Sequence, residues 1–423
     1  MKNKIYTVAI LGIGGRGGDT YGQLLKKETD RFKIVSLCDI RQERLARFGK
    51  ILGVEKENLF IDENEFFQKK RADLLIIATQ DADHIRHTIK AFELGYDILL
   101  EKPITDKKEE CALILEAQKR SGRKALVCHV LRYAPAFLKV AEILDKGEIG
   151  RLVAINALER VSFWHQAHSY VRGNWRNTAT TTPMILAKCC HDLDLLQYYA
   201  KSPCKAVSSV GGLTFFNADN APKNATCRCV DCPNIDTCPY SAKNIYIKTW
   251  EAVGSPSDIW PNNIIASAPL TKEKLEKAIK ESDYGRCVFY CDNDAVDHQI
   301  VTMEFENGVK AELTMTAFTR DGGRRYHFFG TYGEVMLDMQ LKEIRVSKYS
   351  GEKDCYTIQL SQLTEKGYGH GGGDKGLVDA LYDMLDNTKE NCTGLEQSIE
   401  SHLMGIYAEE SRKRGGERMF LHR

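Results

Sequence analysis

The stretch YTVAILGIGGRG, residues 6–17, predicts the fold of the first third of this chain. Its first residues form a continuous apolar run, which is typical of a strand buried on both faces of a parallel sheet. Three glycines follow with the spacing Gly12-x-Gly14-x-x-Gly17, and the next residues, GDTYGQLLKK, predict a helix. A glycine turn with this spacing between a strand and a helix lets the backbone turn tightly and approach a bound phosphate.

A second apolar strand, KIVSLCD (33–39), ends in Asp39, which follows Gly17 by about 20 residues as in dinucleotide-binding folds. A carboxylate at this place accepts hydrogen bonds from the ribose hydroxyls of the adenosine. Because its charge repels a 2′-phosphate, the pattern favours NAD over NADP, and Arg41 would weaken that preference. The alternative is a glycine-rich turn in an unrelated parallel sheet.

Strand-like and helix-like segments continue to alternate, which predicts a doubly wound parallel sheet, the Rossmann fold. The strand-like segments are 72–79, 96–103 and 124–130, and the helix-like segments are 81–95 and 107–122. In such sheets ligands bind beyond the carboxyl ends of the strands. The lysine of YDILLEKPIT (96–105), Lys102, lies at one of these ends and is predicted to face the nicotinamide. A purely structural lysine at the sheet edge is the alternative.

The turn and this sheet edge supply the other candidates for cofactor binding. They are Gly15, Arg16, Thr79, His84 and Glu101, beside Gly12, Gly14, Gly17, Asp39, Arg41 and Lys102.

Together with Glu101-Lys102-Pro103 and the later HDLDLL, these motifs resemble the glucose–fructose oxidoreductase/inositol dehydrogenase (Gfo/Idh/MocA) family. The resemblance covers nearly the whole chain. It implies an enzyme with an N-terminal Rossmann domain, which we place at 1–129, and a C-terminal α+β domain with a large, mostly antiparallel sheet, at 130–423. It also implies an NAD-dependent oxidoreductase whose substrates are sugars, polyols or their derivatives.

The sequence after residue 130 fits that second domain. RYAPAFLKVAEILDKGEIG (132–150) predicts a helix, and strand-like segments follow with few helices between them. FENGVKAEL carries an Asn-Gly pair between apolar runs, which indicates a β-hairpin. We therefore expect an antiparallel sheet, one face of which would cover a second subunit in a homodimer or homotetramer.

PMILAKCCHDLDLLQYYA (183–200) predicts one helix that carries Met184, Lys188, His191 and Leu195 on the same face. In the functional interpretation His191 accepts a hydroxyl proton, because imidazole titrates near neutral pH, while Lys102 and Lys188 stabilise the negative oxygen. Asp194 would orient the ring. In the alternative, Lys188 pairs with Asp192 and His191 is a hydrogen-bonded core residue.

The chain departs from its relatives at one position of this helix. Many family members place an aspartate of the catalytic set four residues before the histidine, and here the position is Ala187. Either Lys188 replaces that aspartate, or the reaction differs.

Two glycine- and aromatic-rich stretches supply candidates for substrate contacts. FWHQAHSYVRGNWRN (163–177) offers His168, Arg172 and Trp175, since sugars bind aromatic platforms beside polar donors. GYGHGGGDKGLVDALYDML (367–385) offers His370, with Asp374 as the predicted N-cap of the next helix. A surface loop fastened by its tryptophans and a flexible glycine loop are the respective alternatives.

Composition excludes several other functions. The 423 residues carry a net charge of +1 and 28% charged residues, so no basic surface for nucleic acid or membranes is expected. No apolar run of 18 residues is present, and the N-terminus lacks a signal-peptide pattern, which indicates a cytoplasmic protein. The partner that the family resemblance implies is a small-molecule carbohydrate.

Four of the 14 cysteines, Cys227, Cys229, Cys232 and Cys238, lie within CRCVDCPNIDTC in a cysteine-rich excursion (217–290). Their spacing predicts a structural zinc site, and reduced or disulfide-linked cysteines are the alternative.

Three functions remain open on the sequence. The first is an NAD-dependent oxidoreductase that acts on a secondary hydroxyl of a sugar, polyol or glycoside. The second is a glycosidase that oxidises its substrate transiently with bound NAD, eliminates the aglycone and returns the hydride. The third is a sensor of sugars and dinucleotides that has lost catalysis, for which Ala187 is the only indication.

Overall fold

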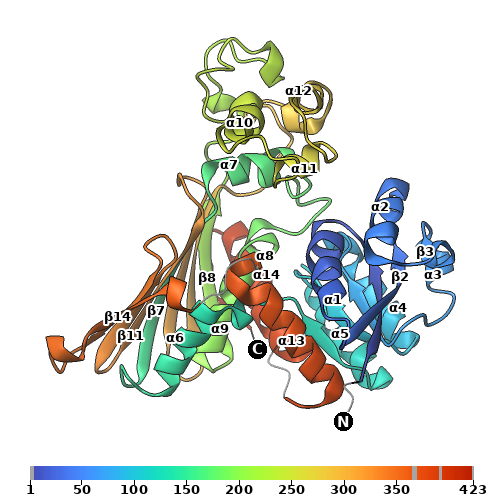
Figure 1. Cartoon of the computed structure of the whole chain (residues 1–423). Helices are drawn as coiled ribbons and strands as arrows, with labels where there is room; N and C mark the ends of the chain where they lie inside the picture. The colour runs from blue at the N-terminus through green and yellow to red at the C-terminus, as the bar shows by residue number, and fades with distance from the viewer. Residues whose placement is uncertain (1–3, 364–368, 390–392, 422–423) are drawn as a thin grey trace.

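The computed structural model describes residues 4–363, 369–389 and 393–421. Figure 1 shows a Rossmann unit and a large curved sheet on the two sides of the helices α13 and α14, with a third lobe above them. Residues 367 and 368 of the predicted glycine loop lie outside the described part of the chain.

The first unit is a parallel sheet in the order β3-β2-β1-β4-β5-β6, as the strand and helix alternation predicted. Successive residues of β1 are buried on opposite faces, with Ile10 in one hydrophobic core and Leu11 in another. The elements are β1 (Tyr6–Leu11), α1 (Gln23–Lys27), β2 (Phe32–Cys38), α2 (Gln42–Leu52), β3 (Leu59–Phe60), α3 (Glu63–Phe66), β4 (Leu74–Ile77), α4 (His84–Glu93), β5 (Asp97–Leu100), α5 (Lys108–Ser121) and β6 (Ala125–Val127).

The second unit is built on a sheet in the order β14-β13-β12-β11-β7-β10-β9-β8-β15. Its pairs are antiparallel except β7 with β10, which run parallel, so the expectation of a mostly antiparallel sheet is confirmed. The strands are β7 (Leu152–Arg160), β8 (Cys204–Gly212), β9 (His298–Phe305), β10 (Lys310–Thr316), β11 (Gly323–Gly330), β12 (Gly333–Asp338), β13 (Glu343–Lys348), β14 (Tyr356–Gln359) and β15 (Met419–Phe420).

Helices cover the inner face of this sheet and connect it to the Rossmann unit. The hydrophobic core that contains Ile10 continues through α13 into Ile155 and Phe328 of the large sheet, so the two units share one core. These helices are α6 (Pro135–Asp145), α8 (Met184–Ala187), α9 (Cys190–Ala200), α13 (Gly373–Asp386) and α14 (Leu395–Lys413).

The third lobe contains the cysteine-rich excursion and α7 (Phe163–His165). It has a separate hydrophobic core, in which Val171 contacts residues of the excursion such as Tyr246 and Trp250. Its remaining helices are α10 (Thr249–Ala252), α11 (Asn262–Ile265) and α12 (Lys272–Glu281), and Figure 1 shows them above both other units.

Two predicted local structures differ from the observed ones. The helix predicted over 183–200 is broken into α8 and α9 at Lys188 and Cys189. Asp374 is not the N-cap of α13, because Gly372 takes that position with a left-handed backbone and Asp374 lies in the first turn. No helix in the described part of the chain is both long and apolar enough to cross a membrane.

Candidate active site

The glycine turn packs tightly against the backbone at the end of β1. Gly12 has a φ of +84°, and a Cβ there would meet the carbonyl oxygen of Ala78 at 2.5 Å. A Cβ at Gly17 would lie 1.9 Å from the carbonyl oxygen of Gly12, whereas one at Gly15 would meet no atom within 4 Å. A Cβ at Gly14 would approach only the guanidinium of Arg44. The turn is therefore compact on its inner side and open at Gly15.

Asp39 lies at the end of β2 beside this turn. Its carboxylate accepts hydrogen bonds from the main-chain N–H groups of Ile13, at 2.8 Å, and Arg41, at 2.9 Å. The side chain of Arg44 lies 3.7 Å from the same carboxylate, and Arg41 is exposed. These groups fit the ribose end of a dinucleotide, because an anchored carboxylate faces the open side of a glycine turn.

Arg16 and Glu101 connect the turn to the end of β5. The guanidinium of Arg16 donates to Glu101 at 2.6 Å and to Asp374 at 2.9 Å, and Tyr21 donates to Glu101 at 2.6 Å. Burial raises the pKa of Glu101, but the charges of Arg16 and Lys102 outweigh it and the pKa lies below its usual value. Arg16 is thus held by carboxylates and positions the turn against the strand that carries Lys102.

Two other cofactor candidates are engaged with the protein. The ring of His84 is 1% exposed, and its Nδ1 lies 2.6 Å from the carbonyl oxygen of Pro103. The hydroxyl of Thr79, at the end of β4, lies 3.0 Å from Nδ1 of His87. His84 therefore fastens α4 to the turn after Lys102 and has no surface for a ligand.

Lys102 points from the Rossmann unit to the break between α8 and α9. Its ammonium donates a hydrogen bond of 3.1 Å to the main-chain carbonyl of Ala187, the position at which the family resemblance led us to expect an aspartate. His191 follows in the first turn of α9 and is 8% exposed. Burial, and then the charges of Lys102 and Arg324, hold the pKa of His191 well below its usual value. Lys102 and His191 thus meet at one place.

The orienting role expected of Asp194 is wrong. Asp194 accepts hydrogen bonds from Nε of Arg132 at 2.7 Å and from its Nη2 at 2.8 Å. In the described residues no hydrogen-bond partner meets the buried Nδ1 of His191, so no carboxylate of that part of the chain holds this nitrogen. The aromatic neighbours of His191 are the imidazoles of His129, at 6.1 Å between centroids, and His370, at 6.4 Å.

Lys188 belongs to a buried group of four charges that the sequence did not reveal. Its ammonium lies 3.3 Å from Glu159 of β7, and Arg324 of β11 pairs with Glu159 at 2.9 Å and with Asp192 at 2.8 Å. The hydroxyl of Tyr326 also donates to Asp192, at 2.6 Å. The expected alternative pair of Lys188 with Asp192 is therefore wrong. Burial raises the pKa of Glu159 against the opposing charges of Arg324 and Lys188.

The alternation of buried and exposed positions along the two strands could have identified Glu159 and Arg324 from the sequence. Glu159 shares the inward phase of β7 with Ile155 and Ala157, and Arg324 shares that of β11 with Tyr326. A charged residue in a core-facing phase requires a buried partner. Because β7, α9 and β11 are far apart in the sequence, no local pattern predicts which of these charged residues pair.

Two of the predicted substrate residues are buried in the third lobe. His168 is 3% exposed, bonds the hydroxyl of Tyr246 at 2.9 Å and stacks on Tyr284. Arg172 is 1% exposed and donates to the carbonyl oxygens of Arg286 and Tyr240, each at 2.7 Å. Both side chains therefore support the lobe and leave little surface for a ligand.

The other two substrate candidates lie nearer to the site. The indole N–H of Trp175 donates to Asp81, in the loop after β4, at 3.1 Å, and its ring is half-buried. His370 is exposed and lies 2.9 Å from Asp374. Burial raises the pKa of Asp374, but the hydrogen bond with His370 and the charge of Arg16 lower it to about 2.

The predicted zinc site is not supported. In the described part of the chain, which includes all four cysteines, no group of three or more His, Cys, Asp or Glu side chains is placed to hold a metal ion. Cys227 is exposed, whereas Cys229 is buried with the guanidinium of Arg172 at 3.5 Å from its sulfur. Cys232 and Cys238 are half-buried free thiols. A cation therefore already lies against the most buried of the four sulfurs.

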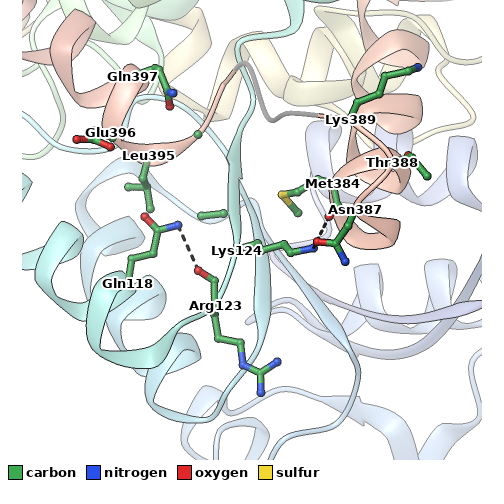
Figure 2. Close-up of a pocket in the computed structure, with 12 residues that line it drawn as sticks. Gln118, Arg123, Lys124, Met384, Asn387, Thr388, Lys389, Leu395, Glu396 and Gln397 are labelled. Carbon is green, nitrogen blue, oxygen red and sulfur yellow. Dashed lines mark hydrogen bonds between the residues drawn. The ribbon is translucent and has the colours of Figure 1, made fainter.

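Figure 2 shows a pocket of about 640 Å³ that lies elsewhere, between β6, α13 and α14. It is at the amino end of β6, opposite the edge that carries Lys102. Lys124 reaches across it and donates to the carbonyl oxygen of Met384 at 2.5 Å and to Asn387 at 2.6 Å. The described residues that line this pocket therefore include none of the cofactor turn.

Comparison with known families agrees with this geometry. Residues 6–129 match the description "Oxidoreductase family, NAD-binding Rossmann fold", and residues 141–419 match "Oxidoreductase family, C-terminal alpha/beta domain". The chain belongs to the Gfo/Idh/MocA oxidoreductase family. Its Rossmann unit is thus an NAD-binding domain of that family.

Several members of the family are similar over different lengths. "Putative oxidoreductase YteT" of Bacillus subtilis (strain 168) is 22% identical, over 85% of this chain and 84% of that protein. The scyllo-inositol 2-dehydrogenase (NAD(+)) of the same organism is 31% identical, over 36% of this chain and 44% of that protein. Among solved structures, a levoglucosan dehydrogenase in complex with NADH has a TM-score of 0.71 at 15% identity, and 99% of each chain is covered. This last likeness shows the fold.

Proposed function

We propose that the protein is an NAD-dependent oxidoreductase that acts on a secondary hydroxyl of a sugar, polyol or glycoside. The observation that carries the proposal is the hydrogen bond from Lys102 to the carbonyl of Ala187. It brings an ammonium from the edge of an NAD-binding sheet to the helix that begins with Cys190 and His191. The inositol and levoglucosan dehydrogenases among the relatives support this class of substrate.

In this proposal each residue has a defined task. His191, which the lowered pKa keeps neutral at pH 7, accepts the proton of the substrate hydroxyl. Lys102 and Lys188 donate hydrogen bonds to that oxygen and stabilise its developing negative charge, which compensates for a weakly basic imidazole. Bound NAD would supply the hydride acceptor for the carbon atom that bears this hydroxyl. Lys188 is held for this task by Glu159, and Lys102 by Ala187.

The residues that would hold NAD are the glycine turn and Asp39. The open side of Gly15 leaves room for a pyrophosphate, and the anchored carboxylate of Asp39 fits ribose hydroxyls. The main-chain N–H of Arg41 and the guanidinium of Arg44 lie beside that carboxylate. Because arginine side chains attract a 2′-phosphate, a preference for NAD over NADP depends on the negative charge of Asp39. Asp39→Ala should therefore weaken NAD binding more than NADP binding, measured by calorimetric titration with each dinucleotide.

The decisive experiment measures NADH absorbance against a panel of sugars, polyols and glycosides, with released aglycone followed in parallel. Steady formation of NADH supports the dehydrogenase. Release of aglycone with retained cofactor and no net NADH would replace it by the transient-oxidation glycosidase. His191→Ala should abolish turnover and leave NAD binding intact, and a variant with near wild-type rates would refute the role of His191. If no compound is turned over, the remaining candidate function is a sensor of sugars and dinucleotides without catalysis.

A further inference from the structure

Trp260 of the cysteine-rich excursion is an exposed indole inside a cluster of aromatic rings. Its ring centroid lies 5.0 Å from that of His165 and 5.2 Å from that of Trp164, both in α7. It also lies 5.6 Å from His168. Despite these contacts Trp260 is 45% exposed, and Trp164 and His165 are only half-buried. We call Trp164, His165 and Trp260 the aromatic platform.

The platform is connected to the candidate active site. The centroid of His165 lies 5.8 Å from that of Tyr170, which lies 6.3 Å from that of Trp175. Trp175 in turn donates its indole N–H to Asp81 of the Rossmann unit. A continuous row of rings therefore runs from the excursion to the sheet edge that carries the cofactor turn.

Charges of the active site act on the platform directly. After burial, the charge of Lys188 is the largest cause that lowers the pKa of His165, and the charges of Lys102 and Arg324 also contribute. Lys102 and Lys188 are the two cations that we assign to the reacting oxygen. The platform therefore lies close enough to them for their charges to act on His165.

A purely structural role explains the platform poorly. The excursion already has a buried tryptophan, Trp250, which is 7% exposed and donates its N–H to the carbonyl oxygen of Pro256. Trp260 instead stays 45% exposed while its ring packs against Trp164 and His165, so three neighbouring rings form one apolar surface that is open to solvent. Its place at the end of a row of rings indicates that this surface belongs to a ligand.

We propose that the aromatic platform binds a ring that is joined to the reacting sugar through a glycosidic bond. This inference rests on the proposed function. Sugar rings and aromatic aglycones both present an apolar face, which stacks on indole and imidazole, and Lys102, Lys188 and His191 meanwhile hold the hydroxyls of the reacting sugar. The substrate is then a glycoside with a cyclic second group, and the excursion selects it over the free monosaccharide.

The test compares methyl, phenyl and glucosyl glycosides of the same sugar across a panel of hexoses. Wild-type protein should show a higher kcat/KM for compounds with a ring in the second position than for the methyl glycosides. Trp260→Ala should reduce that ratio at least about fivefold, and Trp260→Phe should restore part of it. Phenyl and glucosyl compounds distinguish an aromatic aglycone from a second sugar. The matched control is Tyr332→Ala, because Tyr332 is 72% exposed in the turn between β11 and β12, and it should leave the ratio unchanged.

Binding separates failure of this inference from failure of the proposed function. Isothermal titration of NAD-loaded protein with the same glycosides measures the platform without turnover. If no compound reacts but phenyl or glucosyl compounds bind more tightly than methyl ones, and Trp260→Ala removes that difference, the platform stands and the proposed reaction falls. If the ratios are the same in wild type and Trp260→Ala, in turnover and in binding, or if no ring-bearing compound binds, the platform is refuted.

Discussion

The ammonium of Lys102 donates a hydrogen bond of 3.1 Å to the main-chain carbonyl of Ala187. This bond joins the carboxyl edge of the Rossmann sheet to the break between α8 and α9. The family resemblance led us to expect an aspartate side chain at position 187, and in this chain the main-chain carbonyl there accepts the hydrogen bond from the lysine. The missing carboxylate at position 187 therefore does not leave Lys102 without a partner.

Lys102→Met should lower turnover about 100-fold or more, because it removes a charged donor from the reacting oxygen and leaves a side chain of similar length. Binding of NADH, followed by its fluorescence, should change little, since the glycine turn and Asp39 are untouched. The measurement is kcat with the best substrate of the panel. A variant that keeps more than about a tenth of the wild-type kcat would contradict direct contact with the reacting oxygen.

The pH dependence of kcat/KM tests the environment of His191. An ordinary histidine has a pKa of about 6.5, and a catalytic base with that value loses activity as the pH falls through it. Since burial and the charge of Lys102 hold the pKa of His191 well below that value, His191 stays unprotonated at pH 6.5. The acid limb of the profile should therefore begin well below pH 6.5.

The Lys102→Met variant supplies the control for the pH profile. Removal of the Lys102 charge should raise the pKa of His191, so the acid limb of the residual activity of Lys102→Met should move to higher pH. An acid limb at the same pH in both proteins would show that another group titrates there.

The sequence predicted correctly those parts of the molecule whose structure depends on residues that are close together in the chain. The glycine turn, Asp39 and the strand that ends two residues before Lys102 follow from spacing and from apolar runs. The helix predicted over 183–200 is broken at Lys188, whose ammonium pairs with Glu159. This partner comes from β7, about 30 residues earlier, and no local pattern contains that information.

The third lobe shows the same limit. His168 and Arg172 have the chemistry of sugar-binding residues, but both are covered by the excursion, whose hydrophobic core reaches Val171 between them. Trp260 comes from the excursion itself, almost 100 residues after His165. Composition predicted that an aromatic surface exists, and only the packing of the lobe determines which rings remain exposed.

The buried charges beside Lys188 make a prediction about stability. Glu159 and Asp192 balance Arg324 and Lys188, and Asp192 is fully buried. Asp192→Asn keeps the shape of the side chain but leaves an unbalanced positive charge, so the free energy of unfolding should fall by about 3–5 kcal/mol. Unfolding in urea measures the loss.

Asp145→Asn is the matched control for that substitution. Asp145 also pairs with a cation, Lys201, but both side chains are more than half exposed. Its substitution should therefore cost less than about 1 kcal/mol. Equal losses in the two variants would show that the buried charges contribute no more than a surface pair.

The glycine turn offers a pair of substitutions that differ only in the space around the added methyl group. Gly17→Ala would place a Cβ 1.9 Å from the carbonyl oxygen of Gly12, and neither backbone segment can move without disturbing β1. We expect a loss of about 3 kcal/mol or more in the free energy of unfolding. Gly15→Ala meets no atom within 4 Å and lies in a helical turn, where alanine is favoured over glycine, so stability should be unchanged or slightly higher. Thermal unfolding without cofactor measures both, and a Gly17→Ala protein as stable as wild type would show that the turn is not packed against Gly12.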